Sequence, residues 1–272
     1  MAALSISRAW DETKRIVNRD GKLLVSVALA LIVFPTAVLG LLAPPIATEA
    51  APKWVQMVSL VVGLVGIAGQ ISLIRLAVFP ATVVGEAIAS GFRRLLPTFV
   101  ALVLVILGLA LILLPIFALV AGTASFDAAA AGKLTPEAGR ALLLVLLLAF
   151  LAIARFQLVT PVGGVEEIGP IRILIRSWEL SRGHYGRLLA FVALTLVLLL
   201  ILVLFLGQMM GAILVGSVAG EIAPYSVGAL IAGLIAGVAQ GAFSVIVSVM
   251  IARIYAQLAG RIAEPSVPSS GD

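Results

Sequence analysis

Residues Glu166–Leu189 read EEIGPIRILIRSWELSRGHYGRLL, a stretch that mixes charged and aliphatic side chains between two long apolar segments. A helix that begins at Pro170 separates these side chains. One side carries Ile171, Leu174, Ile175 and Trp178, and the other carries Arg172, Arg176 and Glu179. This pattern is typical of an amphipathic helix that lies along a membrane surface. We therefore expect helices of this kind to organise the fold.

The composition of the 272-residue chain predicts an all-α, polytopic membrane bundle. Hydrophobic residues make up 62% of it, charged residues make up 11%, and the mean hydropathy is +1.23. Soluble domains are far less apolar. Several apolar runs reach about 20 residues, the length that a helix needs to cross roughly 30 Å of hydrocarbon. A transmembrane β-barrel would instead need short segments of alternating hydrophobicity.

The charge and the cysteine count exclude several kinds of site and partner. The chain has no cysteine, which rules out disulfides and thiolate metal sites. Its net charge of +5 does not indicate nucleic acid, because the basic residues gather at one side of the apolar spans, where anionic lipid headgroups would lie. The N-terminus opens with charged residues, so no cleavable signal peptide is expected.

Six membrane spans are predicted, with amphipathic surface helices at Ser5–Arg19 and Glu86–Leu96 as well as in the opening stretch. We expect Gly21 to break the first helix and Pro35 to kink the first span. Thr135 and Pro136 are typical of a helix start. The predicted spans are Leu23–Leu42, Val55–Phe79, Leu96–Val120, Arg140–Thr160, Leu188–Val215 and Ser226–Gln257.

The basic residues predict the orientation of the chain. Lys53, Lys133 and Arg140 fall on one side of the membrane, which leaves 15 of the 18 lysines and arginines on the other. Because basic residues concentrate in cytoplasmic segments, both termini are expected in the cytoplasm. The expected location is the inner membrane of a bacterial cell.

The chain also shows an internal repeat. An arginine near the end of each even-numbered span precedes a glutamate by eleven residues, in the pairs Arg75 and Glu86, Arg155 and Glu166, and Arg253 and Glu264. The predicted membrane domain covers 1–260, with repeats at about 5–86, 86–166 and 166–260, and 261–272 is predicted to be a disordered cytoplasmic tail. The repeats either surround a shared cavity or only build a stable bundle. The arginines either snorkel to lipid phosphates or pair with glutamates.

No catalytic, cofactor-binding or metal-binding residue is predicted, and an enzyme is not expected. His184 is the only histidine, and the adjacent Glu166 and Glu167 are expected to cap the following helix. The polar residues in the middle of the predicted spans carry no charge. Gln70, Gln208 and Gln240 could bond across helices, and Gly233, Gly237 and Gly241 would let another helix approach closely.

The stretch Glu166–Leu189 resembles the glycerophosphoryl diester phosphodiesterase membrane domain family. The residues at matching positions are Glu167, Gly169, Pro170, Arg176, Ser177, Trp178, Leu180, Gly183 and Arg187, whereas Ile173 replaces a small residue and Tyr185 stands at a commonly aromatic position. The family's phosphodiesterase is a TIM barrel of roughly 250 residues. This chain is almost all membrane and lacks such a barrel, so the resemblance implies only a multi-span membrane domain with a role connected to lipid or the envelope.

Three functions remain open from the sequence. The first is a non-enzymatic membrane protein that binds or helps to move lipid or another amphiphile. Its candidate contacts with anionic headgroups are Arg172, Arg176, Trp178, Arg182 and Arg187. The second is a structural or scaffolding subunit that docks a soluble or membrane partner or a second copy. The third is a small-solute transporter, which the lack of mid-span charge disfavours.

Overall fold

The computed structural model describes residues 4–43, 52–79, 82–122, 135–216 and 224–260, with only the backbone for 210–216. These ranges are almost entirely helical and contain no strand. Six stretches within them are long and apolar enough to cross a membrane, namely Ile6–Leu42, Lys53–Val78, Val84–Ala121, Pro136–Val165, Tyr185–Met209 and Val227–Leu258. The prediction of an all-α polytopic membrane bundle is therefore confirmed. The predicted tail and Glu264 lie outside the described residues.

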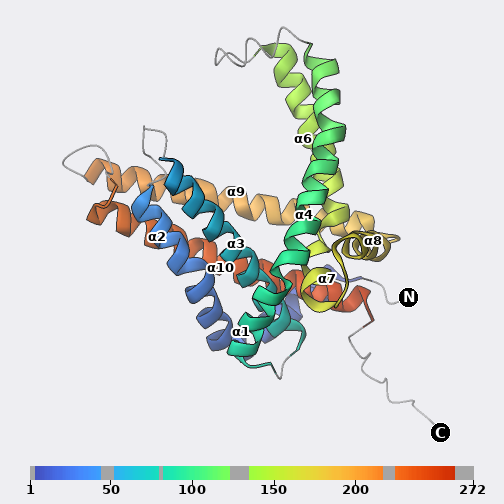
Figure 1. Ribbon diagram of the computed structural model, residues 1–272, viewed down its shortest axis with the longest axis horizontal. Coiled ribbons are helices and arrows are strands. Elements are labelled where there is room, and N and C mark those ends of the chain that lie inside the picture. Colours follow the sequence, from blue (N-terminus) through green and yellow to red (C-terminus); the bar gives the residue numbers. More distant parts are fainter. Residues whose placement is uncertain (1–3, 44–51, 80–81, 123–134, 217–223, 261–272) are drawn as a thin grey trace.

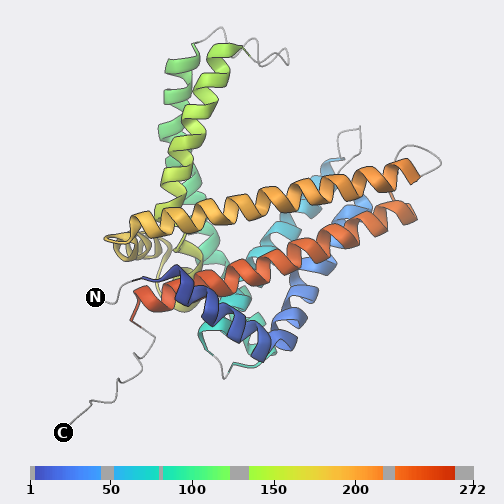
Figure 2. The same cartoon turned by 180° about the vertical axis from the view of Figure 1, so that it is seen from behind.

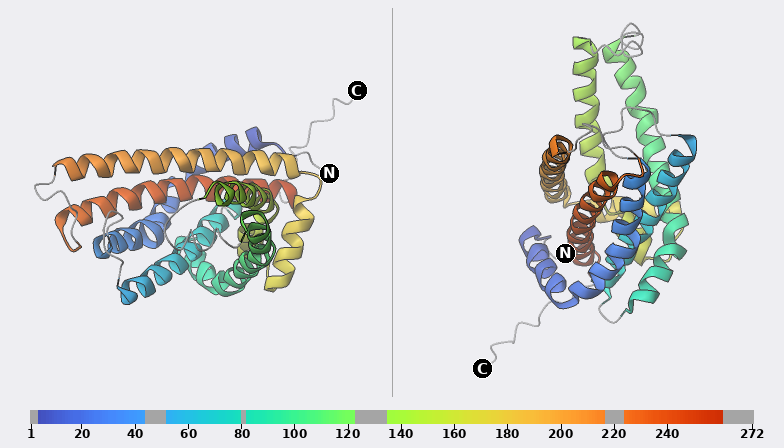
Figure 3. Two further views of the ribbon diagram at one scale, coloured as in Figure 1. Left: turned by 90° about the horizontal axis from the view of Figure 1, so that it is seen from above. Right: turned by 90° about the vertical axis from the view of Figure 1, so that its left-hand side faces the viewer.

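The helices form two arms that diverge from a common base (Figure 1). One arm is the hairpin of α4 (Val84–Ala121) and α6 (Pro136–Phe156). The other arm contains α2 (Phe34–Leu42), α3 (Lys53–Val78), α9 (Tyr185–Gly216) and α10 (Val227–Leu258). The two arms also separate when seen from behind and from above (Figures 2 and 3).

The base is the region where α1 (Ile6–Ala28), α7 (Val159–Val165) and α8 (Pro170–Ser181) meet the starts of α4 and α9 and the ends of α3 and α10. Its core holds Leu24, Ile74, Leu158, Ile173 and Tyr255, all at most 1% exposed. These residues come from α1, α3, α8 and α10 and from the turn that precedes α7. The base is therefore the part of the molecule that joins the two arms.

The first helix does not break at Gly21, so that prediction is wrong. α1 runs through Gly21 as one helix, although the chain turns between its first part and α2 (Figure 2). A glycine costs a helix about 1 kcal/mol relative to alanine, which weakens the helix without ending it. The backbone hydrogen-bonding pattern changes only later, at a π-helical turn that spans Leu29–Val33. Pro35 lies two residues after this turn and cannot donate a backbone hydrogen bond. The kink expected at Pro35 stays a prediction.

Two other boundaries differ from the prediction. The expected surface helix Glu86–Leu96 and the third span form the single helix α4, which contains Pro97 and Pro115. Membrane helices tolerate such prolines because neighbouring groups satisfy the freed carbonyls. The fourth span ends earlier than expected, at Phe156, and a short helix α7 follows. Pro161 explains this end, because its ring would clash with the backbone carbonyl of residue 157 if α6 continued as a regular helix.

Several helix ends agree with the sequence. Thr135 caps α6 by accepting a hydrogen bond from the backbone N–H of Ala138, and Pro136 is the first helical residue. Ser226 caps α10 in the same way. α8 begins at Pro170, as predicted. These starts were predictable because capping depends on residues within one turn of the helix end.

The glycines of α10 let it lie directly against the π-helical turn and α2. A β-carbon added at Gly233 would lie 2.7 Å from the carbonyl oxygen of Ala37, and one added at Gly237 would lie 2.7 Å from the carbonyl oxygen of Val33. Gly40 on α2 faces Gly233 just as closely. This confirms the predicted role of the α10 glycines in close helix packing.

We expect Gly237→Val to destabilise the protein by about 2 kcal/mol, because the added side chain would overlap the backbone of Val33. The measurement is reversible unfolding in detergent. Gly108→Val is the matched control, since a β-carbon at Gly108 on α4 meets nothing within 4 Å. Equal stability of the two variants would contradict the packing described for α10.

Candidate functional site

Glu166 connects three parts of the base. It lies in extended conformation between α7 and α8, where the chain leaves the helix after Val165. Its Oε1 accepts a hydrogen bond of 2.8 Å from the hydroxyl of Tyr255 on α10, and it lies 3.4 Å from Nε of Arg176 on α8. Only 16% of the Glu166 side chain is exposed. The carboxylate therefore anchors the surface helix α8 to the end of the last span.

The neighbouring Glu167 points to a different partner. Its carboxylate lies 2.5 Å from Nη2 of Arg94 on α4. The expectation that Glu166 and Glu167 cap α8 is wrong, since the N-cap residue is Gly169 and no side chain caps that end. Adjacent residues outside a helix point in different directions, so this pair links α4, α8 and α10 to one short connection.

A second carboxylate, that of Glu12, joins the first helix to the last. Its Oε2 lies 2.7 Å from Nε of Arg253 on α10, and its Oε1 lies 3.0 Å from Nε of Arg8. The side chains of Glu12 and Arg253 are 9% and 16% exposed. An ion pair that is this far removed from water is stable only when its charged groups are well aligned and their hydrogen-bonding positions are filled. Here the carboxylate has a cation on each oxygen.

Arg155 is held by aromatic rings. Its guanidinium carbon lies 4.9 Å from the ring centre of Trp178 and 4.4 Å from that of Tyr185. The Tyr185 hydroxyl donates a 2.9 Å hydrogen bond to the carbonyl of Leu151, which fixes the ring. Cation–π contacts are worth about 0.5–2 kcal/mol, depending on desolvation. They join the end of α6 to α8 and to the start of α9.

The arginines of the proposed repeat thus have three different environments. Arg155 lies on aromatic rings, Arg253 pairs with Glu12, and Arg75 donates a 3.3 Å hydrogen bond to the carbonyl of Gly164 while lying 5.5 Å from the ring centre of Phe79. Neither Arg75 nor Arg155 forms an ion pair with the glutamate eleven residues later. All three side chains connect the ends of spans to other helices of the base.

The five residues predicted to contact headgroups divide into two groups. Arg176, Trp178 and Arg187 contact the protein itself. Arg176 lies beside Glu166 and Glu179, Trp178 packs on Arg155, and the guanidinium of Arg187 donates to the carbonyl of Leu4. Arg172 and Arg182 are exposed, and their side chains make no ion pair or hydrogen bond with any described residue. Of the five, these are the two whose guanidinium groups have no protein partner among the described residues and are available to an external anion.

Arg176 stays charged in this setting. Burial alone would lower the pKa of Arg176, but the carboxylates of Glu166 and Glu179 outweigh it and raise the pKa above the ordinary arginine value. The side chain is therefore a permanent cation held in place by two carboxylates. Its role is to position α8.

The exposed side of α8 is apolar and lies beside these free cations. Ile171, Ile175 and Trp178 are 66%, 53% and 42% exposed, whereas Ile173, Ser177 and Ser181 face the protein. The sequence correctly grouped Ile171, Ile175 and Trp178 on one side. An exposed apolar side flanked by arginines suits a helix that lies at the boundary between hydrocarbon and headgroups.

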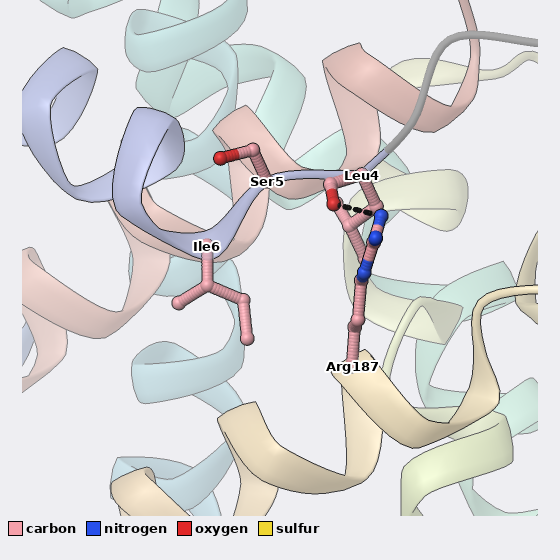
Figure 4. A pocket seen from close by; sticks show the side chains of 4 residues that line it. All are labelled: Leu4, Ser5, Ile6 and Arg187. Carbon is pink, nitrogen blue, oxygen red and sulfur yellow. Dashed lines mark hydrogen bonds between the residues drawn. The ribbon is translucent and has the colours of Figure 1, made fainter.

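A shallow pocket opens at the base between the starts of α1 and α9 (Figure 4). It has a volume of about 380 Å³ and is lined by Leu4, Ser5, Ile6 and Arg187. Figure 4 shows the Arg187 side chain standing along one wall and reaching the backbone of Leu4. The backbone N–H of Ser5 is held by Oε1 of Gln257, at 3.1 Å. The pocket places one cation beside apolar side chains.

The carboxylates and the histidine of the base can be compared with the requirements of a metal site. In the part of the chain that the structure describes, no three histidine, aspartate or glutamate side chains come close enough to hold a metal ion. His184 is half-buried in the connection between α8 and α9. The arrangement is suited to binding anions and anchoring helices.

Sequence reasoning missed Glu12, Tyr255 and the aromatic contacts of Arg155. Their partners are distant in the chain, as with the 241 residues between Glu12 and Arg253. One local signal was available: Trp178 and Tyr185 are the aromatic residues that follow the fourth predicted span and precede the fifth. Arginine beside such rings is a common arrangement.

We predict that Glu12→Gln destabilises the protein by about 2 kcal/mol, because it leaves the largely buried Arg253 without a counter-charge. Unfolding in detergent measures the effect. Glu137→Gln is the control, since Glu137 and Arg140 form an exposed pair that contributes about 0.5 kcal/mol or less. If both variants lose the same small amount, Glu12 does not hold α1 to α10.

Comparison with protein-family models, with curated proteins and with solved structures finds no match for this chain. The resemblance of Glu166–Leu189 to a membrane-domain family therefore stays a prediction that rests on the residues alone.

Proposed function

We propose that this chain is a non-enzymatic integral membrane protein that binds anionic lipid headgroups at its base and so holds, or helps to move, lipid or another amphiphile. The proposal includes the inner membrane of a bacterial cell as its location, with both termini in the cytoplasm. The observation that carries it is the pair of exposed, unpartnered guanidinium groups of Arg172 and Arg182 beside the exposed apolar side of α8.

Physical chemistry favours lipid as the partner of this surface. A basic residue near an anionic membrane surface contributes about 1 kcal/mol to the attraction. Tryptophan prefers the boundary between hydrocarbon and headgroups, where Trp178 would lie if the exposed side of α8 faced lipid. The other three candidate contacts support this surface indirectly, because Arg176 and Trp178 orient α8 and Arg187 holds the start of α1.

A scaffolding role is the second candidate, and the α4–α6 hairpin favours it. Only 6% of the most apolar part of α4 is buried, against 44% for α10. The hairpin stands away from the other arm, so its sides are open to lipid or to another membrane protein (Figure 1). In vivo crosslinking from Leu107 and Leu111 separates the roles, because a scaffold would yield one partner in stoichiometric amounts and no enriched lipid.

Replacing both Arg172 and Arg182 by glutamine is expected to weaken binding of anionic lipid by about 2 kcal/mol, from roughly 1 kcal/mol for each charge. The measurement is native mass spectrometry of protein exchanged into mixed phosphatidylglycerol and phosphatidylcholine, counting bound lipids of each kind. The preference for phosphatidylglycerol should fall in the double variant.

The matched control replaces Lys53 and Arg140 by glutamine, which removes the same charge from the opposite ends of the spans. This variant should keep the preference of the natural protein. An unchanged preference in the Arg172 and Arg182 variant, or an equal loss in both variants, would overturn the proposal that α8 binds headgroups.

A further inference from the structure

A cavity of about 360 Å³ lies within the second arm, bounded by the π-helical turn and α2, α3, α9 and α10. Thr36, Gly66, Gln70, Leu206, Gln240 and Ser244 are among its lining residues. A smaller cavity of about 120 Å³ shares Gln70, Gln240 and Ser244 with it and reaches Thr160 on α7. A line of uncharged polar groups therefore runs from the larger cavity toward the base.

The cavity lies at the level of the hydrocarbon. Gln240 is 13 residues after Val227 and 18 residues before Leu258, which places it about 20 Å from one end of α10 and about 27 Å from the other at a rise of about 1.5 Å per residue. Gln70 lies within α3, 17 residues after Lys53 and 8 residues before Val78, which is about 12 Å from the nearer end. Polar side chains at this depth are costly unless they are paired, so they point to a function.

The two glutamines do not bond across helices, contrary to one expectation from the sequence. The side-chain amides of Gln70 and Gln240 make no hydrogen bond with any described residue, and both border the same cavity. Each amide has donors and an acceptor to offer. A ligand with hydrogen-bonding groups would satisfy amides that hydrocarbon leaves unpaired.

The lining also specifies the charge and the shape of the ligand. None of the residues that line either cavity is Asp, Glu, Lys or Arg, so a charged headgroup would lose its hydration without gaining a counter-ion. The rest of the larger cavity is aliphatic, with Leu31, Ile32 and Leu206 among its walls. The complementary molecule is uncharged, with a hydroxyl, ester or amide at one end and an aliphatic chain at the other.

The surroundings of α3 provide access from the bilayer. Gly63 and Gly66 have no side chain, and a β-carbon at either would meet nothing within 4 Å. A further pocket of about 360 Å³ on α3 shares Gly63 and Ile67 with the first and reaches Phe99 on α4. α9, on the other side, packs mainly on α10 and α6. An aliphatic chain can therefore lie along the glycines of α3.

We propose that this cavity binds the uncharged, hydrogen-bonding end of an aliphatic amphiphile through Gln70, Gln240 and Ser244. The site goes beyond the function proposed for the base, because it lies in the second arm and selects against the charge that Arg172 and Arg182 attract. The α3 glycines form the entry for the aliphatic chain of the ligand, and the side-chain amides of Gln70 and Gln240 supply the selectivity.

The test uses the full-length protein in lipid nanodiscs and a photoreactive monoacylglycerol as the probe. Its phosphorylated analogue, a lysophosphatidic acid with the same chain, reports the effect of charge alone. We expect the neutral probe to label peptides of α3 and α10 that contain Gln70 and Gln240. We expect the phosphorylated probe to label the base instead. Uniform labelling of all spans by the neutral probe would overturn the proposal.

Gly66→Leu is the decisive variant, because Gly66 lines the cavity and a β-carbon added there meets nothing within 4 Å. Labelling of α10 by the monoacylglycerol should be lost, and thermal stability should be retained. Gly108→Leu on α4 is the control and should label as the natural protein does. Full labelling in Gly66→Leu would show that the probe does not occupy this cavity.

A second variant, Gln70→Leu with Gln240→Leu, separates polar recognition from simple filling. Labelling by the monoacylglycerol should fall about tenfold, because two hydrogen bonds of roughly 0.5–1.5 kcal/mol each are lost. A photoreactive alkane should label as well as before or better. Equal loss of both probes would refute the role of the amides. Failure of the Arg172 and Arg182 variant at the base would leave these outcomes unaffected.

Discussion

Helices in hydrocarbon gain little from packing apolar side chains together, because the lipid is as apolar as they are. They are held instead by close backbone approach and by polar contacts, and this chain uses the two at different levels. Within the second arm, Gly233 and Gly237 bring α10 against the carbonyls of α2 and of the π-helical turn. At the base, Glu12 and Glu166 connect α10 to α1 and α8. The last span is therefore the element on which the rest of the structure depends.

This division explains why basic residues near the ends of spans have unequal roles. Arg155, Arg176 and Arg253 lie against aromatic rings or carboxylates and hold helices together. Arg172 and Arg182 have no such partner and face outward. A basic surface can thus contain both structural cations and cations available to lipid. Residue type and position relative to the membrane do not separate the two kinds.

The sequence predicted the six spans, the start of α8 at Pro170 and the cap at Thr135, because these follow from local composition and from capping within one turn. It did not predict that α1 continues through Gly21 or that α7 is a separate helix, since tertiary packing decides how a glycine or a proline is accommodated. The internal repeat stays a prediction.

The candidate site was harder to predict than the fold. All five proposed headgroup contacts lie in one stretch, yet three of them are held by the protein, through Glu166 and Glu179, Arg155 and the carbonyl of Leu4. The Leu4 contact spans 183 residues and requires the chain to fold before the partners meet. Likewise, Gln70 and Gln240 read as packing residues until the cavity between their helices is seen.

The central claim is that some arginines are held by the protein while Arg172 and Arg182 remain open to lipid phosphate. Solid-state NMR in phosphatidylglycerol liposomes tests it directly, by measuring dephasing of guanidinium ¹⁵N signals by lipid ³¹P, with signals assigned through single Arg→Lys variants. We expect strong dephasing of the guanidinium ¹⁵N signals of Arg172 and Arg182, and none for those of Arg155 and Arg253. Equal dephasing of all four, or dephasing of Arg155 and Arg253 alone, would contradict it.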